Sequence, residues 1–280
     1  MGPKTSKTKR PASVNTEAIT IPRVPQEIVD EILDHLAADP DRTPFQSCAL
    51  VSKSWLPSCR RHLFHTVLFT SSNIHRWAIA FPVPEESPGR HIRDLRFRVE
   101  GSSGIFNSEK FSEYIPWFTK VERMSLSRGG GHHLRGFPPS WRLPQSVTSL
   151  TIDADSSFLG DIWNIVVQLP NLNDLSLAGN IVTKDKSAVT GIGTALRGKF
   201  GGQLRLHRGV SFRDTVGMLL ETPTGLHFTE VEICAKYECL SAPRLAEACS
   251  NILVKLTYTA NLRNCKFRPF SRFWHAKYRR

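Results

Sequence analysis

The residues of this 280-residue chain that could take part in catalysis are few and scattered. Residues 193–199 have the G-x-x-x-x-G-K spacing of a phosphate-binding loop, in which backbone N–H groups and the lysine hold phosphates. That loop requires Ser or Thr next to bind magnesium, but Phe200 follows. It should also follow a buried strand, whereas the polar residues 184–187 stand before it. We therefore do not predict nucleotide binding.

Cysteine and histidine spacing gives no stronger sign of a reactive centre. The six cysteines include no C-x-x-C pair, and their spacing matches no common zinc site. Cys48 and Cys59 fall in segments expected to be helical, where cysteine acts as a small apolar side chain. His132 and His133 follow three glycines, a sequence typical of a mobile surface loop. We predict a chain that is not an enzyme and uses no metal or cofactor.

Residues 22–64 are expected to form three short helices. Pro25 suits the first turn of a helix, and the proline in residues 39–41 ends that helix, since the residue before proline leaves the α region. Two further helices are expected at about 44–52 and 53–63. The apolar residues of the first helix fall on one face: Ile28, Val29, Ile32, Leu33 and Leu36. The pattern equally fits a helical hairpin whose apolar faces pack only on each other.

These residues resemble an F-box. Residues 24–33, VPQEIVDEIL, resemble the opening of the F-box motif. Residues 48–55, CALVSKSW, resemble its second half, and residues 61–64, RHLF, resemble its exit. The resemblance is closest to the F-box proteins expanded in basidiomycete fungi, although that family usually has leucine where Val24 stands. Losing one methylene should weaken the contact only slightly. The resemblance implies docking on the Skp-type adaptor of a cullin–RING ubiquitin ligase through Val24, Pro25, Ile28, Leu33, Val51 and Trp55.

A second pattern, apolar-x-x-apolar-x-apolar, recurs along the rest of the chain. Successive copies are 25 to 29 residues apart, and this regular spacing is more informative than the number of matches, because 40% of the residues are apolar. Short amphipathic helices are expected between the copies, at 73–81, 111–118, 159–169, 212–220 and 243–249. The middle residues of the eight copies are Val67, Leu95, Met124, Leu150, Leu175, Leu204, Val231 and Leu256.

One strand and one helix per repeat is the layout of a leucine-rich repeat. Residues 172–180 match its consensus, including Asn180, whose amide should bond backbone groups left unpaired where the strand turns. Residues 253–261 match nearly as well, and the other copies lack the asparagine. We therefore predict an α/β fold: a three-helix F-box, then an irregular leucine-rich-repeat solenoid of parallel strands alternating with helices, least regular at about 181–206. The alternative is a mixed α/β domain without repeat symmetry.

An F-box followed by leucine-rich repeats is a known architecture. The resemblance implies a substrate receptor for ubiquitination, with the repeats binding a protein target on the side lined by strands. Outward strand residues are also commonly just solvated, and the sequence does not identify a target. The candidate target-binding residues are Arg93, Arg96, Arg98, Arg123, Asp153 and Asp174.

The net charge of +12 is concentrated at the two ends. Residues 1–23 carry +4 and residues 261–280 carry +7, so subtracting both from +12 leaves +1 for residues 24–260. The repeats are thus not a basic groove for nucleic acid. The head suits a disordered solubilising tail or a weak nuclear-import patch. The tail interleaves aromatic and basic residues, which can cap a solenoid or stack on bases or on an acidic partner.

Together these features predict four parts: a disordered basic tail (1–21), an F-box (22–64), a solenoid (65–260) and a basic aromatic cap or tail (261–280). We expect a receptor that targets proteins for ubiquitin-dependent degradation, bound to a Skp-type adaptor and through it to a cullin. With no signal peptide or membrane-crossing apolar run, a cytoplasmic or nuclear location is expected. The alternative is a non-catalytic scaffold whose basic aromatic ends bind nucleic acid.

Overall fold

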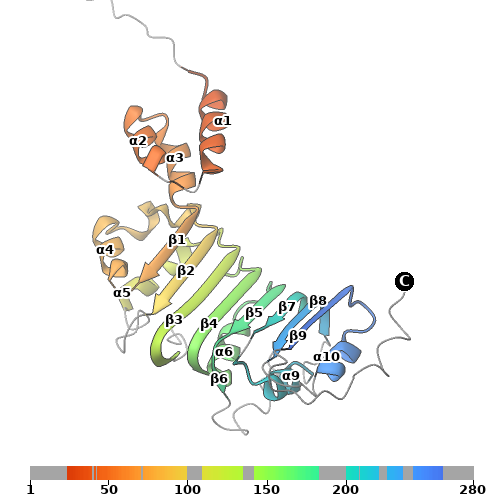
Figure 1. The fold of residues 1–280 in the computed structure, drawn as a ribbon. Coiled ribbons are helices and arrows are strands. Elements are labelled where there is room, and N and C mark those ends of the chain that lie inside the picture. The colour runs from red at the N-terminus through yellow and green to blue at the C-terminus, as the bar shows by residue number, and fades with distance from the viewer. Residues whose placement is uncertain are drawn as a thin grey trace, which may run out of the picture.

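The structure is a computed structural model that describes residues 24–39, 41, 43–70, 72–99, 109–134, 142–182, 200–207, 209–220, 226–235 and 242–260. The two basic ends, 1–23 and 261–280, and the phosphate-loop-like residues 193–199 lie outside this set. A group of three helices comes first, and a long parallel sheet with helices along one side follows it (Figure 1).

The first three helices form a small unit with its own core. They are α1 (Gln26–Ala37), α2 (Thr43–Val51) and α3 (Leu56–Leu63), and we call them the helical unit. Its core consists of Val29, Leu33, Phe45 and Cys59, all buried, with partly buried neighbours that include Trp55. This cluster is separate from the core of the sheet. The three expected helices are therefore present, close to their expected bounds.

Polar contacts fix the ends and the packing of these helices. The backbone N–H of Thr43 donates to Asp41 Oδ1 at 2.9 Å, which caps the start of α2 and holds the pKa of Asp41 below its ordinary value. The Ser58 hydroxyl donates to Asp30 Oδ1 at 2.5 Å and thereby ties α3 to α1. The pKa of Asp30 is lowered by this bond first and then by a bond from Gln26.

The sheet arranges eight strands in the order of the sequence, and every strand pairing among the described residues is parallel. A ninth, β6 (Ile181–Val182), pairs with β4 beside this path. The eight are β1 (Thr66–Thr70), β2 (Asp94–Val99), β3 (Arg123–Leu134), β4 (Ser149–Phe158), β5 (Asp174–Ala178), β7 (Phe200–Leu206), β8 (Leu226–Ala235) and β9 (Lys255–Ala260).

The register of the sheet follows the sequence repeat. The middle residue of each apolar copy pairs with the middle residue of the next, from Val67 beside Leu95 through to Val231 beside Leu256. Strands that follow one another in sequence and in space, each connected by a crossover, make a solenoid-like sheet. The predicted α/β class with parallel strands is confirmed.

Helices cover one face of the sheet and enclose a continuous apolar core (Figure 1). The α-helices are α4 (Asn73–Ala80), α5 (Glu109–Ser112), α6 (Leu159–Val166), α9 (Phe212–Leu220) and α10 (Ala242–Ala248). Three short 3₁₀ helices add to them: η1 (Pro84–Glu86), η2 (Pro88–His91) and η4 (Ile115–Trp117). Near β1 the core is aromatic, with the Phe69 ring centroid 4.8 Å from Phe111 and 5.2 Å from Trp77.

A shared backbone contact aligns the starts of neighbouring strands. In each case one backbone carbonyl just before a strand accepts hydrogen bonds from two N–H groups at the start of the next strand. The His65 carbonyl accepts from Arg93 and Asp94 at 2.9 and 3.0 Å. The same pairing recurs at the carbonyls of Arg93, Glu122 and Thr148. Strands β2 to β5 therefore each begin in fixed register with the strand before them.

Two expectations about loops are corrected. The amide of Asn180 forms no hydrogen bond among the described residues, and the turn after β5 is made by Gly179, whose φ is +90°. A Cβ there would lie 2.0 Å from the Ala154 carbonyl oxygen, so glycine is required. The glycines at 129–131 are not a loop but part of β3, where a bulge shifts the pairing with β4.

Candidate functional site

The face of the sheet that no described helix covers is the first candidate surface. Side chains alternate along a strand, so every second residue of each strand points away from the core. We call these outward side chains the open face. Among the described side chains the charges are unevenly distributed: three arginines and the buried Asp94 lie on β2 and β3, two aspartates on β4 and β5, and two ion pairs on β7 to β9. Those pairs are Arg205 with Glu232, at 3.7 Å, and Lys255 with Glu230, at 3.8 Å.

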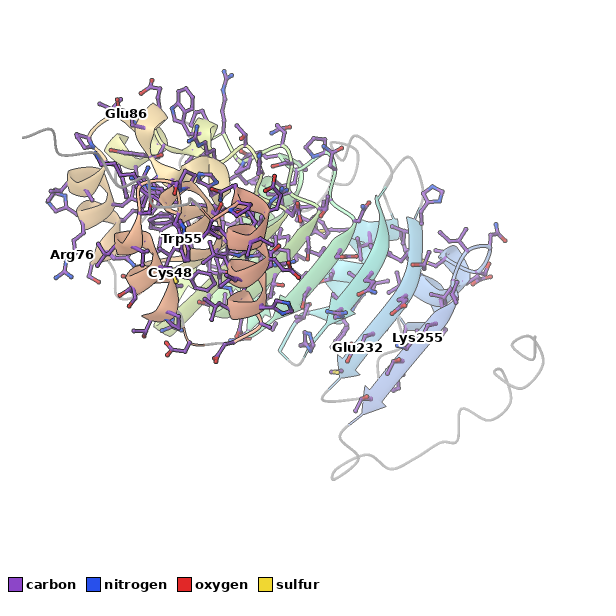
Figure 2. The ribbon with its side chains drawn as sticks, turned by 90° about the horizontal axis from the view of Figure 1, so that it is seen from above. Cys48, Trp55, Arg76, Glu86, Glu232 and Lys255 are labelled. Atoms are coloured by element: carbon purple, nitrogen blue, oxygen red, sulfur yellow. The ribbon has the colours of Figure 1, made fainter. Side chains whose placement is uncertain are left out.

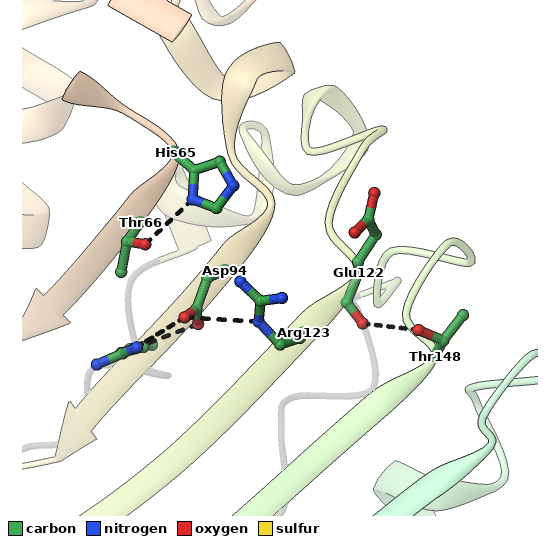
Figure 3. A network of polar contacts seen from close by, with 7 residues as sticks. His65, Thr66, Asp94, Glu122, Arg123 and Thr148 are labelled. Carbon is green, nitrogen blue, oxygen red and sulfur yellow. Dashed lines mark hydrogen bonds and ion pairs between the residues drawn. The ribbon is translucent and has the colours of Figure 1, made fainter. Parts of the chain in front are cut away.

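The basic part of the open face is built around one buried carboxylate. Only 8% of the Asp94 side chain is exposed, yet it contacts two arginines (Figure 3). Arg96 approaches it with Nη2 at 2.7 Å and Nε at 3.2 Å, and Arg123 with Nε at 3.8 Å. The hydrogen bonds from Arg96 to Asp94 raise the pKa of that guanidinium. We call Arg96, Arg98 and Arg123, with Asp94 beneath them, the arginine cluster.

Arg98 completes this cluster from the next outward position of β2. It is exposed, and among the described residues no carboxylate lies within ion-pair distance of it. Arg96 and Arg123 each keep 53% of the side chain exposed while they contact Asp94. The cluster therefore presents three guanidinium groups to solvent, and one acidic side chain offsets part of their charge.

The other three predicted target-binding residues lie apart from the cluster. Arg93 precedes β2 and is ion-paired with Glu122 at the rim of the sheet. Asp153 is exposed on β4, where its backbone position pairs with Ser127. Asp174 is half-buried at the start of β5, and its Oδ1 accepts from the Gln203 N–H at 3.1 Å. Asp174 thus has a structural partner on the next strand.

The helical unit carries the second candidate surface, which is apolar. Val24, Ile28 and Ile32 form a stripe at intervals of four residues, and they are 52, 47 and 42% exposed. On α2, Leu50 is 88% and Val51 66% exposed. Leaving large aliphatic side chains in water is unfavourable, so such a concentration on about 40 residues is typical of a surface that another protein covers.

The predicted adaptor-binding residues are divided between this surface and the core. Val24, Pro25, Ile28 and Val51 are exposed. Trp55 is partly buried against the core of the helical unit. Leu33 is fully buried in that core, which corrects the expectation that it contacts a partner directly. It lies one turn from Val29, and both pack inward because each lies about 100° around the axis of α1 from the exposed residue before it, Ile28 or Ile32.

Three residues of these surfaces were missing from the predicted set. Ile32 and Leu50 are exposed apolar residues on the helical unit, and Asp94 organises the arginine cluster. Ile32 follows Ile28 by one helical turn, so the helix pattern could have identified it. Asp94 could not be separated from other polar strand residues, because its burial depends on the neighbouring strand.

The two candidate surfaces belong to different parts of the molecule. Trp55 and Cys48 lie in the helical unit, at the other end of the chain from Glu232 and Lys255 on the last strands (Figure 2). Cys48 is half-buried and Cys59 buried, as expected for small apolar side chains in helices. Within the described residues, His, Cys, Asp and Glu do not gather in groups of three that could hold a metal ion. Among these residues, moreover, the helices are too short or too polar to cross a membrane.

Comparison with known proteins adds no assignment to these surfaces. The chain matches no model of a known protein family, and a search of curated proteins found no significant match.

Proposed function

We propose that this chain is the substrate-recognition subunit of a Skp–cullin–F-box ubiquitin ligase. In this proposal the helical unit is an F-box that docks on a Skp-type adaptor, and the sheet is a leucine-rich-repeat solenoid whose open face binds the protein to be ubiquitinated. The chain itself needs no catalytic group, because holding the target beside the partner subunits supplies effective concentration.

The observation that carries the proposal is the exposed apolar surface on a separately packed helical unit. Four of the six residues expected to meet the adaptor are exposed: Val24, Pro25, Ile28 and Val51. The remaining two, Leu33 and Trp55, support the helices from the core side. This division is physically consistent, because a docking surface needs both outward contacts and a core that holds them in place.

The regular sheet supports the second half of the proposal. Eight strands in sequence order present a long, mostly polar surface with a defined distribution of charge. Such extended surfaces suit protein recognition. The alternative function, nucleic-acid binding by the basic aromatic ends, concerns residues 1–23 and 261–280, which lie outside the described residues.

A pull-down with the adaptor tests the proposal. The double variant Ile28→Glu/Val51→Glu places charges on the exposed apolar surface without touching the core, since these side chains are 47 and 66% exposed. We expect its affinity for a co-expressed Skp-type adaptor to fall by about 100-fold or more, because each new carboxylate would be buried unpaired in the complex. Binding is measured by affinity capture and titration.

The matched control is Ile79→Glu on α4, which is 67% exposed but lies outside the helical unit. It should bind the adaptor like the wild type. Circular dichroism should show that all variants fold. Equal capture of the wild type and the double variant would refute adaptor docking by this surface.

A further inference from the structure

The arginine cluster indicates what kind of target segment the open face accepts, an inference that rests on the proposed function. We propose that the cluster binds an extended, acidic segment of a target protein. Asp or Glu carboxylates of that segment pair with Arg98 and Arg123, and with the outer edge of Arg96. Among the described side chains, no other part of the open face combines exposed cations with so few local acids.

The first support is that two of the three arginines are held in position before any ligand arrives. Asp94 is 8% exposed and contacts Arg96 at 2.7 Å and Arg123 at 3.8 Å. A guanidinium has five N–H donors, so one edge can be held from below while others remain available above. Because Arg96 and Arg123 are already ordered, a carboxylate that binds them costs less conformational entropy.

The second support is that the cluster is accessible. On β1 the residue paired with Arg96 is Leu68, and on β3 it is Ser125. Thr70 and Ser127 occupy the same positions beside Arg98. These four neighbours are short or uncharged, so the longer arginine side chains can project beyond them. An incoming carboxylate therefore meets N–H donors rather than a competing acid on either side of Arg98.

The third support is the position of Asp153, which limits how far the acidic part of the bound segment can extend across the sheet. It lies on β4, two strands from Arg98, which is a separation of about 10 Å at the usual strand spacing. Its negative charge disfavours an acidic residue at that point and favours a basic one. Since an extended chain advances about 3.3 Å per residue, a segment lying across the strands should carry Lys or Arg about three residues beyond its last acid.

The same boundary argues against a long polyanion. From β4 to β9 the described open face carries four acids, Asp153, Asp174, Glu230 and Glu232, against two bases, Arg205 and Lys255. A nucleic acid would need a continuous basic track for its phosphates. A short acidic segment needs only β2 and β3, and it fits the charges that are present.

The binding test uses fluorescence anisotropy with the full chain. The probe is a fluorescein-labelled, 12-residue Gly/Ser peptide with four consecutive Glu residues and a Lys three residues beyond them. Arg98→Gln/Arg123→Gln should weaken its saturable binding by about tenfold or more, since two charge-assisted contacts are lost. The matched control Arg205→Gln removes an arginine of similar exposure from the same face, on β7, and should change binding by less than about twofold.

Further peptides and one further variant test whether the carboxylates and the lysine of the probe are recognised. A peptide with Gln in place of Glu should not bind, and Asp153→Lys should weaken binding of the Lys-bearing peptide relative to one with Ser at that place. Equal binding of the Gln peptide, or equal affinity of the wild type and Arg98→Gln/Arg123→Gln, would overturn the proposal. So would arginine-dependent binding of only a phosphoserine peptide, or of only a 12-nucleotide single strand.

This outcome is separable from the proposed function. The Arg98→Gln/Arg123→Gln variant leaves the helical unit unchanged, so adaptor capture should match that of the wild type. If the adaptor binds and the acidic peptide does not, the choice of target segment is wrong and the receptor proposal stands. If the peptide binds and the adaptor does not, the open face is a recognition site without a ligase.

Discussion

Individual aspartates in this chain have distinct roles that only their surroundings define. Asp94 supports two arginines from below, and Asp174 accepts a backbone N–H from the next strand. Asp30 accepts from Ser58 at 2.5 Å and from Gln26 at 3.0 Å, and so connects α1 with α3. In each case the carboxylate forms a hydrogen bond or an ion pair with a group on another element, which makes these residues structural as well as charged.

The Asp30–Ser58 contact gives a pH-dependent prediction. Ser58→Ala should destabilise the helical unit by about 1 kcal/mol at pH 7, because it removes a hydrogen bond to a carboxylate. The pKa of Asp30 is lowered in the folded chain, chiefly by Ser58. The stabilisation is therefore present above the unfolded carboxyl pKa of about 3.9 and is lost as pH falls through the lower folded value.

Hydrogen exchange of the α1 and α3 amides measures this effect. Protection in Ser58→Ala should fall at pH 7, and the difference from the wild type should shrink at about pH 3. The control Ser47→Ala changes an exposed serine of α2 and should leave protection unchanged. A difference that stayed constant with pH would show that Asp30 ionisation does not contribute.

At the scale of elements, glycine at a left-handed position fixes the irregular part of the sheet. Gly202 has φ +80° and lies at a bulge between β7 and β8. A Cβ there would lie 2.4 Å from the Asn173 carbonyl oxygen. The following residue, Gln203, donates its N–H to Asp174. The bulge therefore links β5, β7 and β8 where the repeat is least regular.

Gly202→Ala should lower the free energy of unfolding by about 2 kcal/mol or more, because it combines a strained φ with a backbone clash. Gly217→Ala is the matched control. It lies within α9, and a Cβ there meets nothing within 4 Å. That change should stabilise the chain by about 0.5–1 kcal/mol. Urea denaturation measures both, and equal stability of the two variants would contradict this account of the bulge.

Much of the element layout could be predicted from the sequence, and the reasons are physical. Strand positions such as Leu95 and Leu150 follow from an apolar repeat that must face a core. What could not be predicted depends on contacts across units. Examples are the burial of Leu33 with the exposure of Ile28 on one helix, the position of residues 129–131 within a strand, and the buried position of Asp94.

At the scale of the whole molecule, the helical unit and the sheet have separate cores of very different size. Four buried apolar residues form the first, whereas the second is continuous along the sheet. A unit of about 40 residues with so small a core is only marginally stable alone. It should therefore open more readily than the sheet, and a partner that binds its folded form should stabilise it.

Hydrogen exchange with and without a Skp-type adaptor tests this expectation. Amides of α1 to α3 should exchange about 100-fold faster than those of β3 and β4 in the free chain, a difference of about 3 kcal/mol. Saturating adaptor should slow exchange in the helical unit and leave β3 and β4 unchanged. Equal protection of both parts in the free chain would show that they unfold together.

The shared carbonyl at the start of β2, β3, β4 and β5 has a consequence for how such a chain can change over time. From β2 to β5, each strand is aligned by a carbonyl of the repeat before it, that of His65 for β2 and that of Thr148 for β5. A tandem duplication of one of these repeats would therefore bring its own aligning carbonyl and N–H groups and leave distant repeats undisturbed. Gain or loss of a repeat could lengthen or shorten the open face by one strand at a time, while the outward residues of each strand remained free to vary.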